Sequence, residues 1–253
     1  MTNKIATPRS LRANLKLWPV PTRFRPLVAV EVLGYAAMFA AFMNFALPTG
    51  GEWRLVHWVF APLALALPLI SNRLHGDSWR DSGCRVDTLW VSLRGVVVPL
   101  LAAVLLLVVV GAISDGYSMS SPRRFARNIF RYVLWGPVQQ YLLCAFMLRR
   151  LLQAGLPERT AAVTAALIFG AIHGPNLVLV GLSSGLALMT CLLFLRYPNI
   201  LALGLVHAVL ALTVYYALPV EWHQRLTAGG IYRARMERKA EPVENVPRGL
   251  KLP

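Results

Sequence analysis

The chain contains 253 residues, of which 57% are apolar and 15% are charged, and Lys and Arg outnumber Asp and Glu by 26 to 11. Soluble domains are about 45–50% apolar, so this composition argues against a soluble enzyme, and the same high hydrophobicity argues against a disordered chain. The three cysteines are too few for a disulfide framework. The composition instead predicts a protein of the lipid bilayer.

The net charge of +15 is concentrated beside the apolar segments. Residues 1–26 carry six basic residues and no acid, and residues 219–253 carry seven basic residues against four glutamates. Basic flanks of this kind follow the positive-inside rule and favour contact with anionic lipid headgroups. We therefore expect membrane lipids as partners and no nucleic acid.

Seven apolar stretches follow the basic start, at residues 27–47, 57–70, 96–113, 129–148, 160–173, 177–195 and 200–218. A helix of about 20 residues crosses a bilayer core of about 30 Å, so the second and fifth stretches are short. The fifth ends at Gly174-Pro175-Asn176, which breaks a helix and predicts a turn within or near the membrane. The pattern predicts an all-α, polytopic transmembrane bundle with about seven or eight spanning or re-entrant segments.

The chain divides into three predicted regions. We expect residues 1–26 to form a basic cytoplasmic segment, residues 27–218 the transmembrane domain, and residues 219–253 a basic tail with a surface helix at 232–239 and disorder at 242–253. Reading 27–47 as a retained signal anchor places the protein in the bacterial cytoplasmic membrane with its N-terminus in the cytoplasm. The side of the tail stays open, because an eighth crossing, a re-entrant fifth segment or an interfacial helix near 122–131 would each change it.

Polar side chains inside apolar helices are costly and mark sites that need a partner or a function. Cys144 follows Gln140 by four residues and Phe169 precedes His173 by four, so each pair shares a helix face. The amides can serve as interhelical glue, and each histidine alone can be a core residue bonded to a carbonyl. Together, however, two imidazoles on separate helices can converge on one cavity. The candidate site residues are Gln139, Gln140, Cys144, Phe169, His173, Asn176 and His207.

A metal site is weakly supported by these residues. Catalytic zinc usually has three protein ligands, and His173 and His207 provide two, which Cys144 would have to complete. We therefore expect no cofactor.

Two segments resemble motifs of a known family. The run Phe169-Gly-Ala-Ile-His173-Gly-Pro-Asn176 resembles the second motif of the CAAX-protease and bacteriocin-processing intramembrane endopeptidases, and residues 198–210 resemble the third, a mid-membrane histidine at His207. The likeness covers about residues 129–218, with a weaker one at residues 79–85. It implies a helical membrane fold, a site on these histidines, and hydrolysis of a membrane-embedded or lipidated peptide.

The chain departs from the family in its first motif, Glu-Glu-x-x-x-Arg. The matching residues are Gln139, Gln140 and, in place of the arginine, Cys144, while Ala211 stands where the third motif usually has asparagine. In the family, glutamate is thought to take a proton from the attacking water, which a carboxamide cannot do. A general base accelerates such a reaction by about 10²–10⁴-fold, so the family's usual hydrolysis should be much slower in this protein.

Three interpretations therefore compete. The first is a divergent peptidase with His173 or His207 as base, Gln139 and Gln140 as substrate or oxyanion ligands, and a carboxylate from Glu31. The second is an inactive pseudoprotease that binds such segments as a chaperone or regulator. The third is a cysteine-type enzyme using Cys144. An unrelated transporter-like or structural role is the remaining alternative; it needs ion-path residues, of which the helical core has few.

Overall fold

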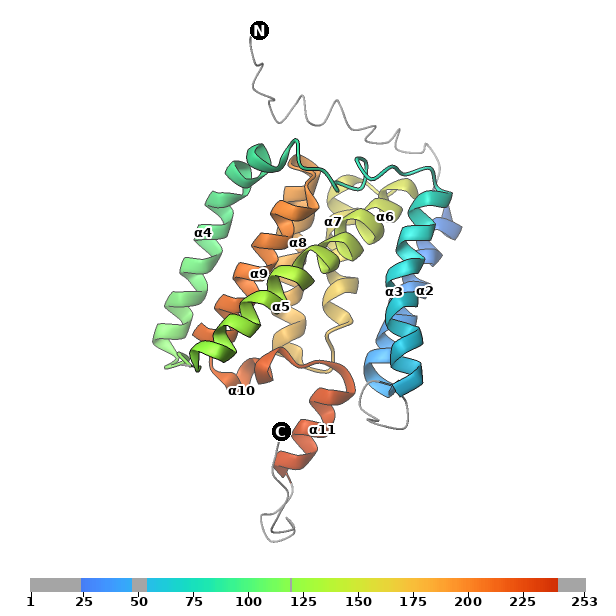
Figure 1. Cartoon of the computed structure of the whole chain (residues 1–253). Coiled ribbons are helices and arrows are strands. Elements are labelled where there is room, and N and C mark those ends of the chain that lie inside the picture. The colour runs from blue at the N-terminus through green and yellow to red at the C-terminus, as the bar shows by residue number, and fades with distance from the viewer. Residues whose placement is uncertain (1–23, 47–53, 119, 241–253) are drawn as a thin grey trace.

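The computed structural model describes residues 24–46, 54–118 and 120–240, and helices form all the regular secondary structure in those residues. The first two helices lie side by side at one edge of the bundle (Figure 1). Helix α2 (Pro26–Ala41) continues into the π-helical turn η1 (Phe42–Ala46), and α3 (Arg54–Leu74) returns beside it. The Tyr35 hydroxyl ties the pair together by donating to the Ala64 carbonyl at 2.9 Å.

Helix α9 (Ile200–Ala217) packs against both α4 (Leu89–Ile113) and α5 (Pro122–Gln140). Helices α5 and α9 cross at glycines, because a Cβ on Gly136 would lie 2.3 Å from the Gly204 carbonyl oxygen, and a Cβ on Gly204 would meet Pro137 at 2.5 Å. Only residues without a side chain permit so close an approach of two backbones. This crossing determines which residues of α5 face α9.

Helix α5 continues without a break through the π-helix η3 (Tyr141–Leu148) into α6 (Arg149–Gln153). Every η3 residue from Leu142 to Leu148 is buried. Helices α7 (Glu158–Ala171) and α8 (Leu177–Arg196) pack as a pair against this segment. A π-helix is rare and occurs frequently at functional sites; here it begins directly after Gln140.

The C-terminal part crosses under the bundle (Figure 1). It consists of α10 (Val220–His223), η4 (Gln224–Leu226) and α11 (Gly229–Ala240). Helix α11 includes the basic segment 232–239 that the sequence predicts as a helix, and it packs on η1, where a Cβ on Gly229 would lie 2.3 Å from the Met43 carbonyl oxygen. Helix α11 therefore anchors the C-terminal tail to the first helical hairpin.

The all-α prediction is confirmed for the described residues, but the predicted number of seven or eight spans is not. Four described helices are long and apolar enough to cross a membrane: Pro26–Phe45, Leu89–Ile113, Leu177–Arg196 and Ile200–Ala217. The predicted segment 129–148 belongs to a helix that begins earlier, with arginines, and the fifth segment forms a helix of 14 residues. Helices that pack inside a bundle need not span it alone.

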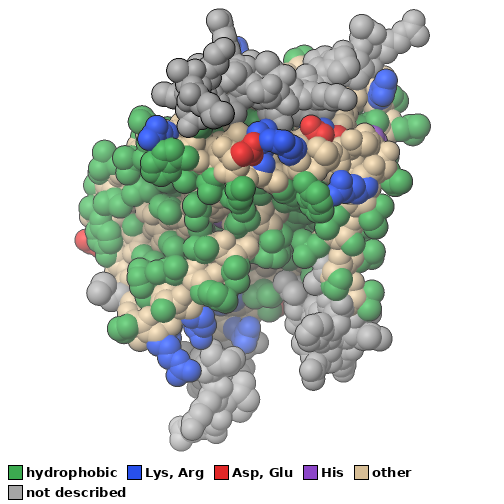
Figure 2. All heavy atoms as spheres, turned by 45° about the horizontal axis from the view of Figure 1, so that its top comes forward, with side chains coloured by type: hydrophobic (Ala, Val, Ile, Leu, Met, Phe, Trp, Pro, Cys, Tyr) green, Lys and Arg blue, Asp and Glu red, His purple; other side chains and the backbone are tan. Residues whose placement is uncertain are grey.

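A broad band of hydrophobic side chains covers the face seen in Figure 2, with Lys and Arg above and below it. This distribution and the four long apolar helices are those of an integral membrane protein. The predictions for the N-terminal segment, the disordered tail end and the cytoplasmic N-terminus concern residues 1–23 and 241–253, outside the described residues, and they stay predictions.

Candidate active site

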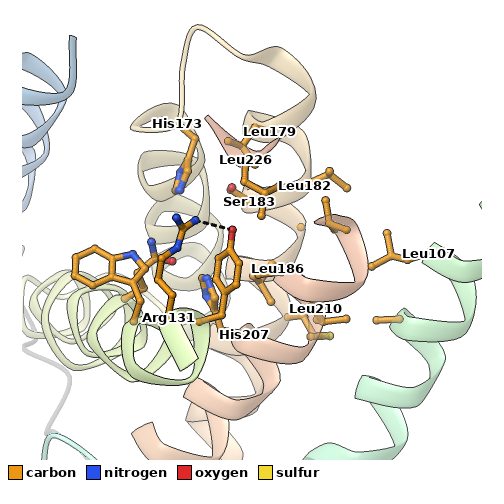
Figure 3. Close-up of a pocket in the computed structure, with 18 of the residues that line it drawn as sticks. Leu107, Arg131, His173, Leu179, Leu182, Ser183, Leu186, His207, Leu210 and Leu226 are labelled. Carbon is orange, nitrogen blue, oxygen red and sulfur yellow. Dashed lines mark hydrogen bonds between the residues drawn. The ribbon is translucent and has the colours of Figure 1, made fainter. Parts of the chain in front are cut away.

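A cavity of about 1020 Å³ opens between α4, α5, α8 and α9, and its lining includes Gln139, His173 and His207. Figure 3 shows both imidazoles pointing into it. A second cavity of about 250 Å³ reaches toward α2, α7 and α11. Four residues line both cavities: Trp135, Gln139, His173 and Leu226. His173 and Gln139 therefore lie at the junction of the two cavities, and His207 lines the larger one.

Gln140 lies outside the cavity lining and orients His207. Its side-chain nitrogen lies 3.1 Å from His207 Nδ1, and its oxygen accepts from Cys144 Sγ at 3.5 Å. An amide nitrogen only donates, so Nδ1 of His207 is the acceptor and the neutral ring carries its proton on Nε2. His207 therefore presents an N–H donor. The α5–α9 glycine crossing explains the contact, since Gln140 is one turn beyond Gly136.

His173 has the opposite tautomer. Its Nδ1 lies 2.8 Å from the Phe169 carbonyl oxygen, which can only accept, so Nδ1 carries the proton and Nε2 keeps a free lone pair. The Phe169 ring packs on the imidazole with centroids 5.0 Å apart. His173 lies outside the four membrane-length helices, and burial lowers its pKa below the ordinary histidine value. The ring is therefore a neutral acceptor at pH 7.

Asn176 holds the segment that covers the junction. Its side-chain oxygen caps α8 by accepting from the Leu179 amide at 3.1 Å, and its nitrogen donates to the carbonyls of His223 and Thr227 at 3.3 and 3.2 Å. Between those two carbonyls lies Leu226, which lines both cavities and has a left-handed φ of 57°. The amide of Asn176 is thus used within the protein, and it positions the cover of the site.

Cys144 is fully buried in η3, where its sulfur contacts Gln140 and the side chains of Thr190 and Cys191. In the part of the chain that the structure describes, no histidine is bonded to this thiol. A cysteine nucleophile needs a base within hydrogen-bond reach. The geometry therefore does not support the cysteine-type enzyme.

Glu31 is directed away from the histidine pair. Its carboxylate lies 3.6 Å from Arg150 Nε and 3.8 Å from His75 Nε2. Arg150 is completely buried and also donates to Asp77 at 3.0 Å and to Asn72 at 2.7 Å. The idea that Glu31 supplies a catalytic carboxylate is therefore wrong for this structure; its carboxylate belongs to an ionic cluster around Arg150.

That ionic cluster and two further arginines were not anticipated from the sequence. Asp77, Arg149 and Arg150 read as loop and flank charges, although all three are buried. Arg127 and Arg131 line the large cavity. Their spacing of four residues on one helix was the only signal, because it places both on the same face.

The described residues contain no group of three or more His, Cys, Asp and Glu side chains arranged to hold a metal ion. His173 and His207 are the two imidazoles at the cavity, and a carboxylate or thiolate does not join them there. This donor set falls short of the three protein ligands of a catalytic zinc site.

Residues 122–213 match the family model described as Type II CAAX prenyl endopeptidase Rce1-like. The match runs from the start of α5 through most of α9 and contains Gln139, Gln140, His173 and His207. It confirms the resemblance to CAAX-type endopeptidases that the second and third motifs predict. No curated protein and no solved structure matches the chain significantly.

Proposed function

We propose that this CAAX-protease-like membrane protein hydrolyses a peptide bond of a membrane-embedded or lipidated peptide at the junction of the two cavities. One observation carries the proposal: the two imidazoles beside one cavity have complementary hydrogen-bonding states. His173 offers a free lone pair, and His207 offers an N–H. A hydrolytic site needs one group of each kind, a base for water and a donor for the oxyanion.

In the proposed reaction, His173 Nε2 takes a proton from a water molecule as the water oxygen attacks the peptide carbonyl carbon. The carbonyl oxygen becomes an oxyanion and accepts the N–H of His207. The carbon–nitrogen bond then breaks, and protonated His173 returns its proton to the leaving amine. Gln140 does not react; it keeps His207 in the donating tautomer through the hydrogen bond to Nδ1.

Gln139 lines both cavities, so its amide is available to hydrogen-bond the substrate backbone. Leucines and other apolar side chains of four helices surround the larger cavity, which suits an apolar or lipidated peptide. The Phe169 carbonyl orients the His173 ring but carries no negative charge. It therefore stabilises the imidazolium that forms during the reaction less than an orienting carboxylate would. We therefore expect turnover to be slow.

The test uses the purified full-length chain in neutral detergent with a set of fluorogenic transmembrane and lipidated peptides. Cleavage should occur with the wild type and fall at least about 100-fold in His173→Ala and in His207→Ala, since each variant removes one catalytic group. His75→Ala is the matched control, because His75 contacts Ser71 and Glu31 and lines neither cavity. Equal cleavage by all four proteins would contradict the proposal.

The second candidate is a pseudoprotease that binds such peptides without cutting them. It is favoured by the absence of any acidic residue among those that line the two cavities and by the bonding of both ends of the Gln140 amide to neighbouring side chains. The double variant Gln139→Glu/Gln140→Glu separates the candidates. If peptides bind to the wild type but cleavage appears only in the double variant, the protein is a binding protein.

A further inference from the structure

The large cavity contains positive charge without an acidic counterpart. Arg127 and Arg131 line it. The other lining residues are uncharged, because both imidazoles are neutral. Figure 3 shows the Arg131 side chain reaching into the space that His173 and His207 face.

The described partners of Arg131 leave its charge uncompensated. One guanidinium nitrogen donates to the Tyr132 hydroxyl at 3.1 Å, the contact drawn as a dashed line in Figure 3, and the guanidinium lies 4.9 Å from the Tyr132 ring centre. Arg127 and Arg131 take no part in the ion pairs of Asp77, Asp87 and Glu31. Tyrosine provides a polar contact but no negative charge.

Arg127 and Arg131 are exposed residues that line an apolar cavity, so their guanidinium groups are accessible to an incoming anion. The guanidinium fork matches the planar oxygen pair of a carboxylate or the oxygens of a phosphate. The rest of the lining consists mainly of hydrocarbon, including Leu106, Leu107, Leu182, Leu186 and Leu210. The complementary ligand therefore has an oxyanion at one end and an apolar chain at the other.

We propose that the large cavity binds a single-chain anionic amphiphile, with its carboxylate or phosphate on Arg131 and Arg127 and its hydrocarbon chain between α4, α8 and α9. The volume of about 1020 Å³ is at the upper end of the range of about 300–1,000 Å³ for small-molecule sites, which leaves room for a long chain. Binding of the amphiphile does not depend on peptide cleavage, since it requires neither histidine to react. A bound amphiphile would fill the cavity that a peptide would enter.

Binding is measured with the full-length protein in a neutral maltoside detergent. The probes share one oleoyl chain: oleate, oleoyl lysophosphatidate and uncharged monoolein. At least one anionic probe should bind about tenfold or more tightly than monoolein. A preference for oleate would identify a carboxylate head, and a preference for the lysophosphatidate a phosphate head.

The variant Arg131→Gln should abolish the preference for the anionic probe, and Arg127→Gln should reduce it. Arg124→Gln, on the same helix but outside the cavity lining, is the matched control and should keep it. Should Arg131→Gln fail to fold, Arg131→Lys keeps the charge but loses the fork, and weakened anion binding by that variant supports the site.

Equal affinity for monoolein and both anions would overturn the proposal, as would an unchanged preference in a folded Arg131→Gln variant. Binding of a peptide with a free carboxyl terminus but of neither anionic lipid would also overturn it. Because these measurements need no turnover, a protein that binds the anions but cleaves no peptide would contradict only the proposed function.

Discussion

At the scale of single residues, the replacement of a buried acid by an amide changes what the position can do. Gln140 cannot accept a proton, but it donates to His207 and accepts from Cys144, so both ends of its side chain are satisfied. A glutamate in the same place would bury a charge beside a thiol. The residue thus acts as a positioning residue for the imidazole next to it.

Replacing Gln140 with leucine should therefore destabilise the protein by about 1–3 kcal/mol, because it leaves His207 Nδ1 buried without a donor. If the protein is a peptidase, kcat should also fall about tenfold or more with little change in KM, since the histidine loses its fixed tautomer. Unfolding in mixed micelles and steady-state kinetics measure the two effects. A variant as stable and as active as the wild type would show that the hydrogen bond has no role.

Protonation of His173 should determine how the peptidase activity falls at low pH, which is the acid limb of its pH dependence. The base must be unprotonated, so activity should rise as pH increases through the pKa of His173, and burial lowers that pKa below the ordinary value. The activity should thus persist at a lower pH than for an exposed histidine. A pH–rate profile checks this, with His75→Ala as a control that leaves the limb in place; a limb above the ordinary histidine pKa would contradict it.

At the scale of elements, the site depends on how closely α5 and α9 approach. Gly136 and Gly204 bring the two backbones together and thereby place Gln140 against His207. The π-helix η3 begins directly after this contact, at Tyr141. The close crossing of α5 and α9 and the π-helix η3 therefore meet at the Gln140–His207 hydrogen bond.

Alanine at Gly136 should destabilise the bundle by about 1–3 kcal/mol, because the new Cβ would lie 2.3 Å from a carbonyl oxygen of α9. Substrate or ligand binding in the cavity should weaken as the helices separate. Gly34→Ala in α2 is the matched control, since a Cβ there meets nothing within 4 Å, and it should be neutral or stabilising. Thermal unfolding of the two variants side by side decides the point.

At the scale of the whole molecule, a buried ionic cluster joins the first hairpin to the core. Arg150 contacts Glu31 of α2, Ser71 and Asn72 of α3, and Asp77 of the following loop. Asp77 also pairs with Arg149, whose side chain is likewise buried. One cluster therefore fixes several elements that are distant in the sequence.

The variant Asp77→Ala should cost about 3–5 kcal/mol of stability, because it leaves two buried arginines short of their carboxylate. Asp87→Ala is the comparison. Its carboxylate pairs with Arg85 and Arg80 and has a lowered pKa, but it is 46% exposed, so its loss should cost at most about 1 kcal/mol. Equal losses in the two variants would contradict the assigned role of the buried cluster.

Local sequence specified the apolar helices and the histidine motifs, but it did not specify the number of spanning helices. Apolar runs such as residues 200–218 are visible in composition, and the match at residues 122–213 agrees with the motifs around His173 and His207. The number of spanning helices was not predictable in this way. Helix α5 starts with arginines and buries only one face, at Asn128, Tyr132, Gly136 and Gln140, so its length and hydropathy do not describe its place in the bundle.

Glu31 and Arg131 show the same difference at the site. The sequence suggested Glu31 as a carboxylate for the peptidase site, and only packing places it at Arg150. Arg131 lay within the predicted stretch 129–148 without an assigned role, and only the meeting of four helices makes it a cavity residue. Both outcomes depend on contacts between residues far apart in the chain.

The sequence by itself determined that the protein is helical and membrane-embedded and that it carries two histidines in the motifs of CAAX-type endopeptidases without the paired glutamates, since hydrophobicity and local motifs are properties of the chain. Only the tertiary structure decided that Gln140 fixes His207, that His173 offers the free lone pair, and that two arginines enter the same cavity. The physical reason is that hydrogen-bond direction and cavity shape arise where separate helices meet, at distances that no local pattern encodes.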